Sequence, residues 1–272
     1  MSLTIFTPFV FVFGLIIGSF LNALIWRLHT GESMMERSKC PKCKSTIAWY
    51  DNIPVLSFLF LRGKCRSCKT RISFQYPLVE FVVGLLFVLA FNFEFRIFNF
   101  ESILNFLILK PGYKFFLALF RDFFLVSVMV IVFVYDLRWY LILDIVTLPA
   151  IAVLFVLNLI LGISWQSLLI SGIIGGGFFL LQFAISKGKW IGGGDIRLGF
   201  LMGIALAWPK IIIALMLAYI VGAFVGLGLI VFGRKKWSSQ VPFGIFLSTA
   251  TVATLFWGDF LMQWYLGLIG LQ

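Results

Sequence analysis

Long apolar runs alternate with short polar segments along most of the 272-residue chain. Each run holds about 20 residues, the length at which an α-helix crosses the ~30 Å hydrocarbon core of a bilayer. Backbone groups in lipid must be paired within the chain, and the runs lack the alternation typical of a membrane barrel, so helices are predicted. We expect about eight transmembrane helices, at roughly 4–26, 76–93, 115–135, 143–162, 167–186, 195–208, 211–232 and 242–268.

Composition supports the same fold class. Hydrophobic residues make up 61% of the chain and charged residues only 12%, which is too few to solvate the surface of a soluble domain of this size. The chain is therefore predicted to be an all-α polytopic membrane protein. We divide it into a first transmembrane helix at 1–26, a loop domain at 27–75 and a transmembrane core at 76–272.

The 22 Lys and Arg residues are spread unevenly over the predicted loops. Ten lie between Arg27 and Arg71, after the first helix, and seven more fall on the same side of an eight-helix path. Because cytoplasmic loops carry the excess of Lys and Arg, we expect the long basic loop in the cytoplasm and both termini outside. This bias accounts for the net charge of +11, so the lipid bilayer, and not nucleic acid, is the expected partner.

All four cysteines lie in the basic loop, as two C-x2-C pairs separated by 21 residues. Cys40 and Cys43 form the first pair, and Cys65 and Cys68 form the second. Four thiolates at this spacing can close a tetrahedral cage around Zn²⁺, which folds a small loop that has no core of its own. Disulfides are the alternative, but thiols in the cytoplasm are kept reduced. The sequence thus predicts a structural zinc in a ribbon-like loop.

Five of the 11 acidic residues lie in predicted loops, but Asp136, Asp144, Asp195 and Glu80 fall at predicted cytoplasmic helix ends. Ionisable groups at such positions face protein or water, and they are candidates for function. We expect Asp144, in DIVTLP, to be the N-cap of the fourth helix.

Asp136 ends the third predicted helix and Asp195 opens the sixth, so the topology sends both to the same membrane edge. Two carboxylates about 3 Å apart cannot both ionise. One can take a proton from water while its protonated partner donates to a carbonyl oxygen, which hydrolyses a peptide bond. A helix cap is the alternative role for Asp195, whereas Asp136 lies where the helix dipole disfavours a negative charge.

Three glycines, Gly192, Gly193 and Gly194, come directly before Asp195. Glycine adopts φ values that other residues avoid and lets a second backbone approach closely. We expect these residues to admit an extended peptide with its scissile carbonyl beside the Asp195 carboxylate.

An ordered set of motifs over nearly the whole chain resembles the bacterial type IV prepilin peptidases, a family of bifunctional leader peptidases and N-methyltransferases of the GxGD aspartyl class. The motifs are GSFLNALIWRL at 18–28, DNIPVLSFLFLRGKCRSC with the two cysteine pairs, ISFQYPLVE, GGGDIRLG, and VPFGIFL at 241–247. The sequence departs from the family at Leu143, where a proline is usual, and at Arg197, where a lysine is usual.

The resemblance implies that Asp136 and Asp195 are the catalytic pair of an aspartyl peptidase core, with Gly192, Gly194 and Arg197 in the active-site loop. It implies cleavage of a short basic leader from prepilin or pseudopilin precursors, for type IV pili or type II secretion, at the cytoplasmic face of the bacterial inner membrane. Methylation of the new N-terminal amine, with S-adenosylmethionine as the methyl donor, is implied to follow.

The methyltransferase site is implied by the resemblance alone, because no Rossmann glycine fingerprint is present. It is expected at the cytoplasmic loop and the neighbouring helix ends, with Glu80, Asn52 and the cysteine pairs as contributors.

Two other classes of protein remain as alternatives. Buried acids also mark the ion paths of proton-coupled transporters, and the zinc ribbon is compatible with a membrane scaffold.

Overall fold

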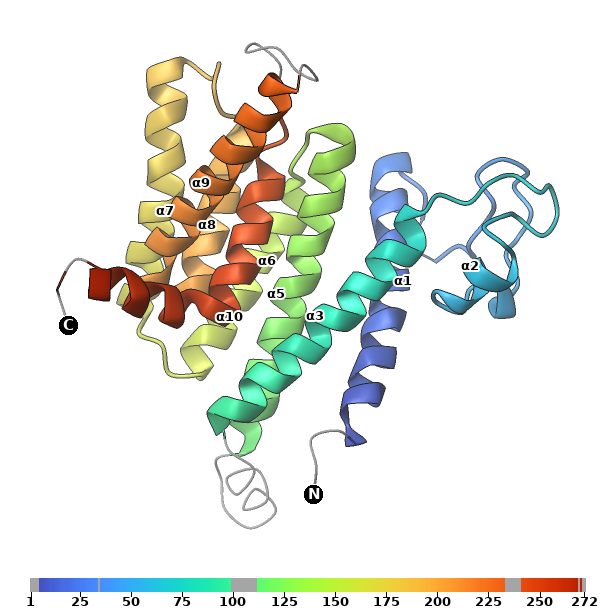
Figure 1. Cartoon of the computed structure of the whole chain (residues 1–272), viewed down its shortest axis with the longest axis horizontal. Helices are drawn as coiled ribbons and strands as arrows, with labels where there is room; N and C mark the ends of the chain where they lie inside the picture. The colour runs from blue at the N-terminus through green and yellow to red at the C-terminus, as the bar shows by residue number, and fades with distance from the viewer. Residues whose placement is uncertain (1–4, 34, 99–111, 233–240, 269, 271–272) are drawn as a thin grey trace. The chain divides into compact units, whose positions relative to one another are not determined.

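The computed structural model describes residues 5–33, 35–98, 112–232, 241–268 and 270, and these fold into helices (Figure 1). Within these ranges the β contacts are two isolated bridges. The elements are α1 (Thr7–Thr30), the 3-10 turn η2 (Trp49–Asp51), α2 (Leu56–Phe60), α3 (Gln75–Phe98), α5 (Gly112–Trp139), α6 (Asp144–Ile160), α7 (Trp165–Ser186), α8 (Gly193–Leu206), α9 (Lys210–Val231) and α10 (Gly244–Leu268). The all-α prediction is confirmed, and a helix is found at each of the eight predicted positions.

Six of the described helices are long and apolar enough to cross a membrane, namely α1, α3, α5, α7, α9 and α10. The other two are shorter, with 17 residues in α6 and 14 in α8. At 1.5 Å per residue, α8 is only ~21 Å long, less than the ~30 Å of hydrocarbon. The count of eight spans is therefore not confirmed, but the chain is a multi-pass membrane protein.

The chain divides into two compact units, Met1–Phe115 and Phe116–Gln272. In the first unit, α1 and α3 approach closely because two glycines of α1 lie four residues apart. A Cβ atom on Gly14 would lie 2.7 Å from the Cα of Gly84, and one on Gly18 would lie 2.6 Å from the Cα of Glu80. Small residues at this spacing are typical of tightly packed membrane helices.

Helix α8 is enclosed within the second unit. Nearly every residue from Leu198 to Leu206 is buried, because α6, α7, α9 and α10 all contact this helix. The packing against α7 is close, since a Cβ on Gly175 would lie 2.2 Å from the carbonyl oxygen of Gly199. From α6, Asn158 donates through Nδ2 to the Ile204 carbonyl at 2.8 Å. These contacts fix the position of α8, whose first turn carries Asp195.

Candidate active site and metal centre

Asp136 lies one turn before the end of α5 and is 4% exposed. Its Oδ2 atom has no hydrogen-bond partner among the described residues. The start of α10 faces this carboxylate. A Cβ on Gly244 would lie 2.8 Å from Oδ2, and the backbone N–H groups of Gly244 and Ile245 approach it. Because a helix N-terminus carries a partial positive charge, α10 offsets the unfavourable position of Asp136 at the end of α5.

Asp195 lies in the first turn of α8 and is partly exposed. The N–H of Gly192, the N-cap of α8, donates to Asp195 Oδ2 at 3.0 Å. Gly194, next to Asp195, and Gly244, against Asp136, both lie close to Ile142, so the fold brings the two carboxylates to one part of the second unit. In the described structure no hydrogen bond joins the two carboxylates. Asp195 also contributes to the N-terminal cap of α8, because its carboxylate accepts the hydrogen bond from the backbone N–H of the N-cap residue.

Gly194 and Gly244 leave space for Ile142, which lies in the segment between α5 and α6. A Cβ on Gly194 would lie 2.9 Å from the Cβ of Ile142, and one on Gly244 would lie 3.3 Å from Ile142 Cδ1. Ile142 thus fits between the start of α8 and the start of α10. The expectation that the glycines before Asp195 adopt unusual φ values is wrong. None of them is among the positive-φ residues, because Gly192 is extended, with φ −80°, and the next two begin the helix.

Arg197 and Asp144 form an ion pair that links α8 to the start of α6. Both side chains are about half exposed, 44% and 49% respectively. The prediction that Asp144 is the N-cap of its helix is wrong. Leu143, with extended φ and ψ of −85° and 125°, occupies that position, and no side chain caps the helix there. The Asp144 carboxylate forms an ion pair with Arg197 instead. The positive charge of Arg197 therefore has a counter-charge within the protein.

Sequence reasoning missed a polar contact near Asp195. The hydroxyl of Tyr219 in α9 donates to Oε1 of Gln182 in α7 at 2.9 Å, and the Tyr219 ring lies 5.0 Å from that of Phe243. Phe243 directly precedes Gly244, which lies against Asp136, so Tyr219 lies beside the carboxylate site. The signal in the sequence was a Gln and a Tyr within apolar helices, because polar side chains at that depth pair with one another.

The four cysteines come together in the first unit. Their Sγ atoms all lie within 4.8 Å of one another, and those of Cys40 and Cys68 are 3.9 Å apart. Zn–S bonds of ~2.3 Å arranged as a tetrahedron give S···S edges of ~3.8 Å. A disulfide bond is much shorter, at ~2.05 Å, and all four cysteines are free. The arrangement therefore fits a metal centre, and four thiolates are a donor set that suits Zn²⁺.

The two cysteine pairs fold as two copies of one turn. The Lys44 N–H donates to the Cys40 carbonyl at 2.9 Å, and the Lys69 N–H donates to the Cys65 carbonyl at 3.0 Å. Lys44 and Lys69 both adopt positive φ, 57° and 59°. Each turn is closed by one of the isolated bridges, Lys39 with Thr46 and Lys64 with Arg71. The repeated spacing of the sequence thus becomes a repeated geometry that presents two thiols from each side.

A hydroxyl group follows the second cysteine of each pair by two residues. Ser45 Oγ lies 2.9 Å from Cys43 Sγ, and Thr70 Oγ1 lies 3.3 Å from Cys68 Sγ. The side-chain hydrogen bond of Thr70, aided by its backbone, lowers the pKa of the Cys68 thiol to about 6. Ser45 lowers the pKa of Cys43 in the same way. Because metals bind the thiolate, these hydroxyls favour the form that a metal needs.

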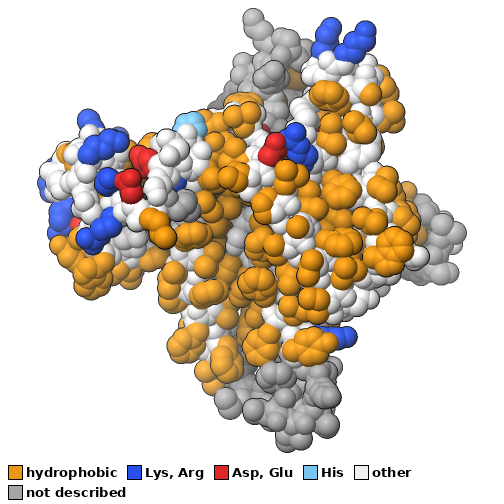
Figure 2. Space-filling view, turned by 180° about the vertical axis from the view of Figure 1, so that it is seen from behind, with side chains coloured by type: hydrophobic (Ala, Val, Ile, Leu, Met, Phe, Trp, Pro, Cys, Tyr) orange, Lys and Arg blue, Asp and Glu red, His pale blue; other side chains and the backbone are white. Residues whose placement is uncertain are grey.

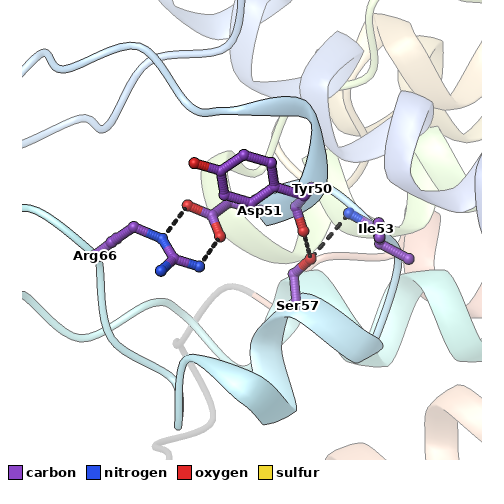
Figure 3. Close-up of polar contacts among 5 residues, drawn as sticks. All are labelled: Tyr50, Asp51, Ile53, Ser57 and Arg66. Atoms are coloured by element: carbon purple, nitrogen blue, oxygen red, sulfur yellow. Dashed lines mark hydrogen bonds and ion pairs between the residues drawn. The ribbon is translucent and has the colours of Figure 1, made fainter.

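The segment between the cysteine pairs is tied to the second pair (Figure 3). Arg66 donates from Nε and Nη2 to the two carboxylate oxygens of Asp51, at 2.7 and 2.6 Å, and its guanidinium lies 5.3 Å from the centre of the Tyr50 ring. Ser57 donates to the Tyr50 carbonyl and accepts from the Ile53 N–H, both at 2.9 Å. The loop is therefore a folded unit with its own polar contacts.

Glu80 is 7% exposed in α3, and its Oε2 accepts a 2.7 Å hydrogen bond from the Val55 N–H. Val55 has φ of 60°, a conformation that β-branched residues rarely adopt. The buried carboxylate thus holds a strained backbone position. Asn52 ends η2 and is exposed. Asn52 thus begins a short segment, 52–55, whose last residue is bound by Glu80 of α3.

Fold and site together define a multi-pass membrane protein that has a carboxylate pair at helix ends and a small four-thiol domain. Residues 12–93 match the bacterial peptidase A24 N-terminal domain, and residues 123–227 match the type IV leader peptidase family. The chain belongs to the type IV leader peptidase family.

Curated relatives extend this match over most of the chain. The "Prepilin leader peptidase/N-methyltransferase" of Aeromonas hydrophila is 34% identical, covering 94% of this chain and 92% of that protein. The protein of the same name from Bacillus subtilis (strain 168) is 31% identical, covering 94% and 96%. No solved structure matches the chain. These relatives support the enzyme and give no support to a transporter or a scaffold.

Proposed function

We propose that the chain removes the leader from prepilin or pseudopilin precursors with Asp136 and Asp195 and then methylates the new N-terminus. The enzyme class rests on the family, whose relatives are named prepilin leader peptidase/N-methyltransferase. The residue roles rest on one observation. Two carboxylates from distant parts of the chain lie on elements that pack against the same residue, Ile142, and the more buried one keeps Oδ2 without a partner among the described residues.

Hydrolysis by this pair needs one carboxylate ionised and the other protonated. The ionised group takes a proton from water while the protonated group donates to the scissile carbonyl oxygen, and the water oxygen bonds to the carbonyl carbon. The C–N bond then breaks as the leaving amine takes up a proton. The contact from Gly192 fixes Asp195 Oδ2, while Oδ2 of Asp136 is left for water or substrate.

We place this reaction at the cytoplasmic face of the bacterial inner membrane, with both termini on the opposite side. The excess of Lys and Arg in the tetra-cysteine loop supports this sidedness. In this arrangement 1–26 is the first transmembrane helix, 27–75 the cytoplasmic zinc-binding loop and 76–272 the peptidase core. Gly192 and Gly194 shape the active-site loop, and Arg197 anchors it through Asp144.

We assign the methyl-transfer site to the first unit. Zn²⁺ held by Cys40, Cys43, Cys65 and Cys68 would fix the fold of the loop. Glu80 would hold the strained turn at Val55, and the exposed Asn52 amide would be free to meet a polar ligand. When it is bound, S-adenosylmethionine supplies an electrophilic methyl group to the free amine that cleavage exposes.

Cleavage of a prepilin by the purified protein in lipid tests the catalytic pair. Asp136→Asn and Asp195→Asn should each lower kcat by about 10²- to 10⁴-fold, which is the usual contribution of a general acid or base to the rate. Asp259→Asn is the matched control, because Asp259 is a helix carboxylate 62% exposed and paired with Lys210. Normal cleavage by either active-site variant would contradict the assignment. Mass spectrometry of the product measures the cut and the added methyl group together.

A further inference from the structure

We infer that the tetra-cysteine loop docks on the lipid bilayer surface through a patch of exposed apolar side chains, which we call the interface patch. It consists of Trp49, Leu56, Leu59, Phe60 and Phe74. Phe60 is 82% exposed, Trp49 75% and Phe74 67%. Side chains of this size are rarely left so exposed on a folded domain unless another surface covers them. This inference does not depend on the peptidase reaction.

Helix α2 directs its part of the patch outward. Leu56, Leu59 and Phe60 follow the i, i+3, i+4 spacing that puts residues on one helix face. On the other face Ser57 is buried, and the Phe58 ring packs 6.0 Å from that of Phe74. The short helix therefore turns Ser57 and Phe58 towards the loop and its stripe of Leu56, Leu59 and Phe60 away from it.

The patch continues into a surface that faces lipid. Phe74 directly precedes the spanning helix α3, on which Leu78, Phe81, Val82 and Leu85 are all exposed. These residues recur every three to four positions and form one apolar stripe, as expected for the lipid-facing side of a membrane helix. Phe74 extends the stripe by one turn and meets α2 through Phe58. The loop thus presents apolar side chains where this stripe leaves the membrane.

Charge identifies the occupant as an anionic lipid surface. Ten Lys and Arg residues lie between Arg27 and Arg71, against three acids, Glu32, Glu36 and Asp51. Two of these acids are paired, Asp51 with Arg66 and Glu36 with Lys39. In Figure 2 this loop, at the left, carries Lys and Arg side chains beside an apolar area at its lower edge. Such a surface attracts anionic headgroups and repels a basic peptide.

The aromatic members of the patch fit the same occupant. Trp and Tyr concentrate at the membrane–water boundary, where an apolar ring with a polar edge meets both phases. Trp49 and Tyr50 lie side by side in η2, with ring centres 5.6 Å apart. We therefore place η2 and α2 at headgroup depth, with the four cysteines just outside it.

Photolabelling of the intact protein in vesicles that contain phosphatidylglycerol tests this placement. A photoactivated carbene reagent that dissolves only in the bilayer should label peptides carrying residues 56–60 about as strongly as those from the start of α3. The peptide carrying Met35, which is 96% exposed in the same loop but outside the patch, should stay unlabelled. Labelling confined to the spanning helices would overturn the inference.

A double variant, Leu59→Ser with Phe60→Ser, separates the patch from the fold of the loop. Labelling of the peptides with Trp49 and Phe74 should fall several-fold, whereas Met35→Ser should leave it unchanged. Reactivity of the four thiols shows whether each variant keeps the loop folded.

Loss of the parent's labelling when a prepilin is added would make the patch a protein-binding site and overturn the lipid assignment. Equal labelling in phosphatidylcholine vesicles would overturn the role of charge.

Discussion

The tetra-cysteine site and the carboxylate pair are built in opposite ways. The four thiols come from one stretch of 29 residues, Cys40–Cys68, and the cysteines of each pair form hydrogen bonds to residues at most five positions away. The carboxylates come from α5 and α8, and a third helix, α10, supplies the N–H groups that face Asp136. The first site is folded by its own neighbourhood, whereas the second exists only when distant helices are packed together.

This difference predicts how each site fails. A local site is lost when one of its own ligands is lost, and the damage stays within the loop. An assembled site is also sensitive to residues that touch no substrate, because small shifts between packed helices move the reacting groups. The changes below separate these two kinds of failure.

The largest effect is expected from Cys40→Ser combined with Cys65→Ser, which removes one ligand from each pair. Structural zinc contributes ~10–16 kcal/mol of binding free energy in small metal-folded peptides, so the loop should lose its fold. Methylation of the cleaved product should disappear, while kcat for cleavage changes by less than about tenfold because the carboxylates belong to the other unit. Metal content and product mass measure both results. Loss of cleavage equal to that of Asp136→Asn would contradict this separation.

Gly194→Ala should be next in size. Its Cβ would lie 2.9 Å from the Cβ of Ile142, and overpacking of this kind costs ~1–3 kcal/mol. The kcat for cleavage should fall together with the stability, because the start of α8 must move away from Ile142. Gly193→Ala is the matched control, since a Cβ there meets nothing within 4 Å, and it should stay within ~0.5 kcal/mol of the parent. Thermal unfolding in detergent and kcat compare the two; equal effects would refute the packing argument.

The thiol pKa values give a third test in the metal-free protein. The pKa of Cys68 is lowered to about 6, so its thiolate prevails at pH 7, and its stabilising hydrogen bonds are lost as the pH falls through about 6. The alkylation rate of Cys68 should therefore drop about tenfold between pH 7 and pH 5, in proportion to its thiolate fraction. Peptide mass spectrometry measures the rate. With Thr70→Val the decline should begin at higher pH; an unshifted profile would exclude Thr70 as the cause.

The smallest effect is expected from Arg197→Lys. Its ion pair with Asp144 is about half exposed on both sides, and exposed pairs contribute ~0–1 kcal/mol. Lysine keeps the charge but loses the planar guanidinium, so cleavage should change less than about fivefold on that scale. A loss as large as that of Asp195→Asn would show that Arg197 acts on the substrate directly. Kinetics at several salt concentrations distinguish these outcomes, because an exposed pair weakens with salt.

Much of the fold and the cysteine cluster could be predicted because their signals are strong in single segments. Apolar runs located the helices, and the repeated C-x2-C spacing located the thiols before any contact was known. Asp136 and Asp195 stood out as acids at the ends of apolar runs. The count of spans could not be predicted, because the short apolar run of α8 looks like a span in the sequence, whereas its burial against four other helices allows it to be shorter.

Contacts between helices explain what the sequence could not show. Nothing in DIVTLP reveals that Asp144 turns to Arg197, since that choice depends on how α6 meets α8. The glycines before Asp195 suggested unusual backbone angles, but Gly194 is small because Ile142 lies against it. The pairing of Tyr219 with Gln182 likewise depends on the packing of α9 beside α7. In each case the residue type was visible and its partner was not.

The shortness of α8 has a consequence for access to the carboxylate pair. A helix of ~21 Å cannot reach both faces of a hydrocarbon layer of ~30 Å. Because α6, α7, α9 and α10 enclose this helix, the missing length is lined by protein and not by lipid. Asp195, in the first turn of α8, can then lie below the membrane edge and still be partly exposed. A polypeptide could have its bond cut there while its apolar segment remained in the hydrocarbon layer outside the protein.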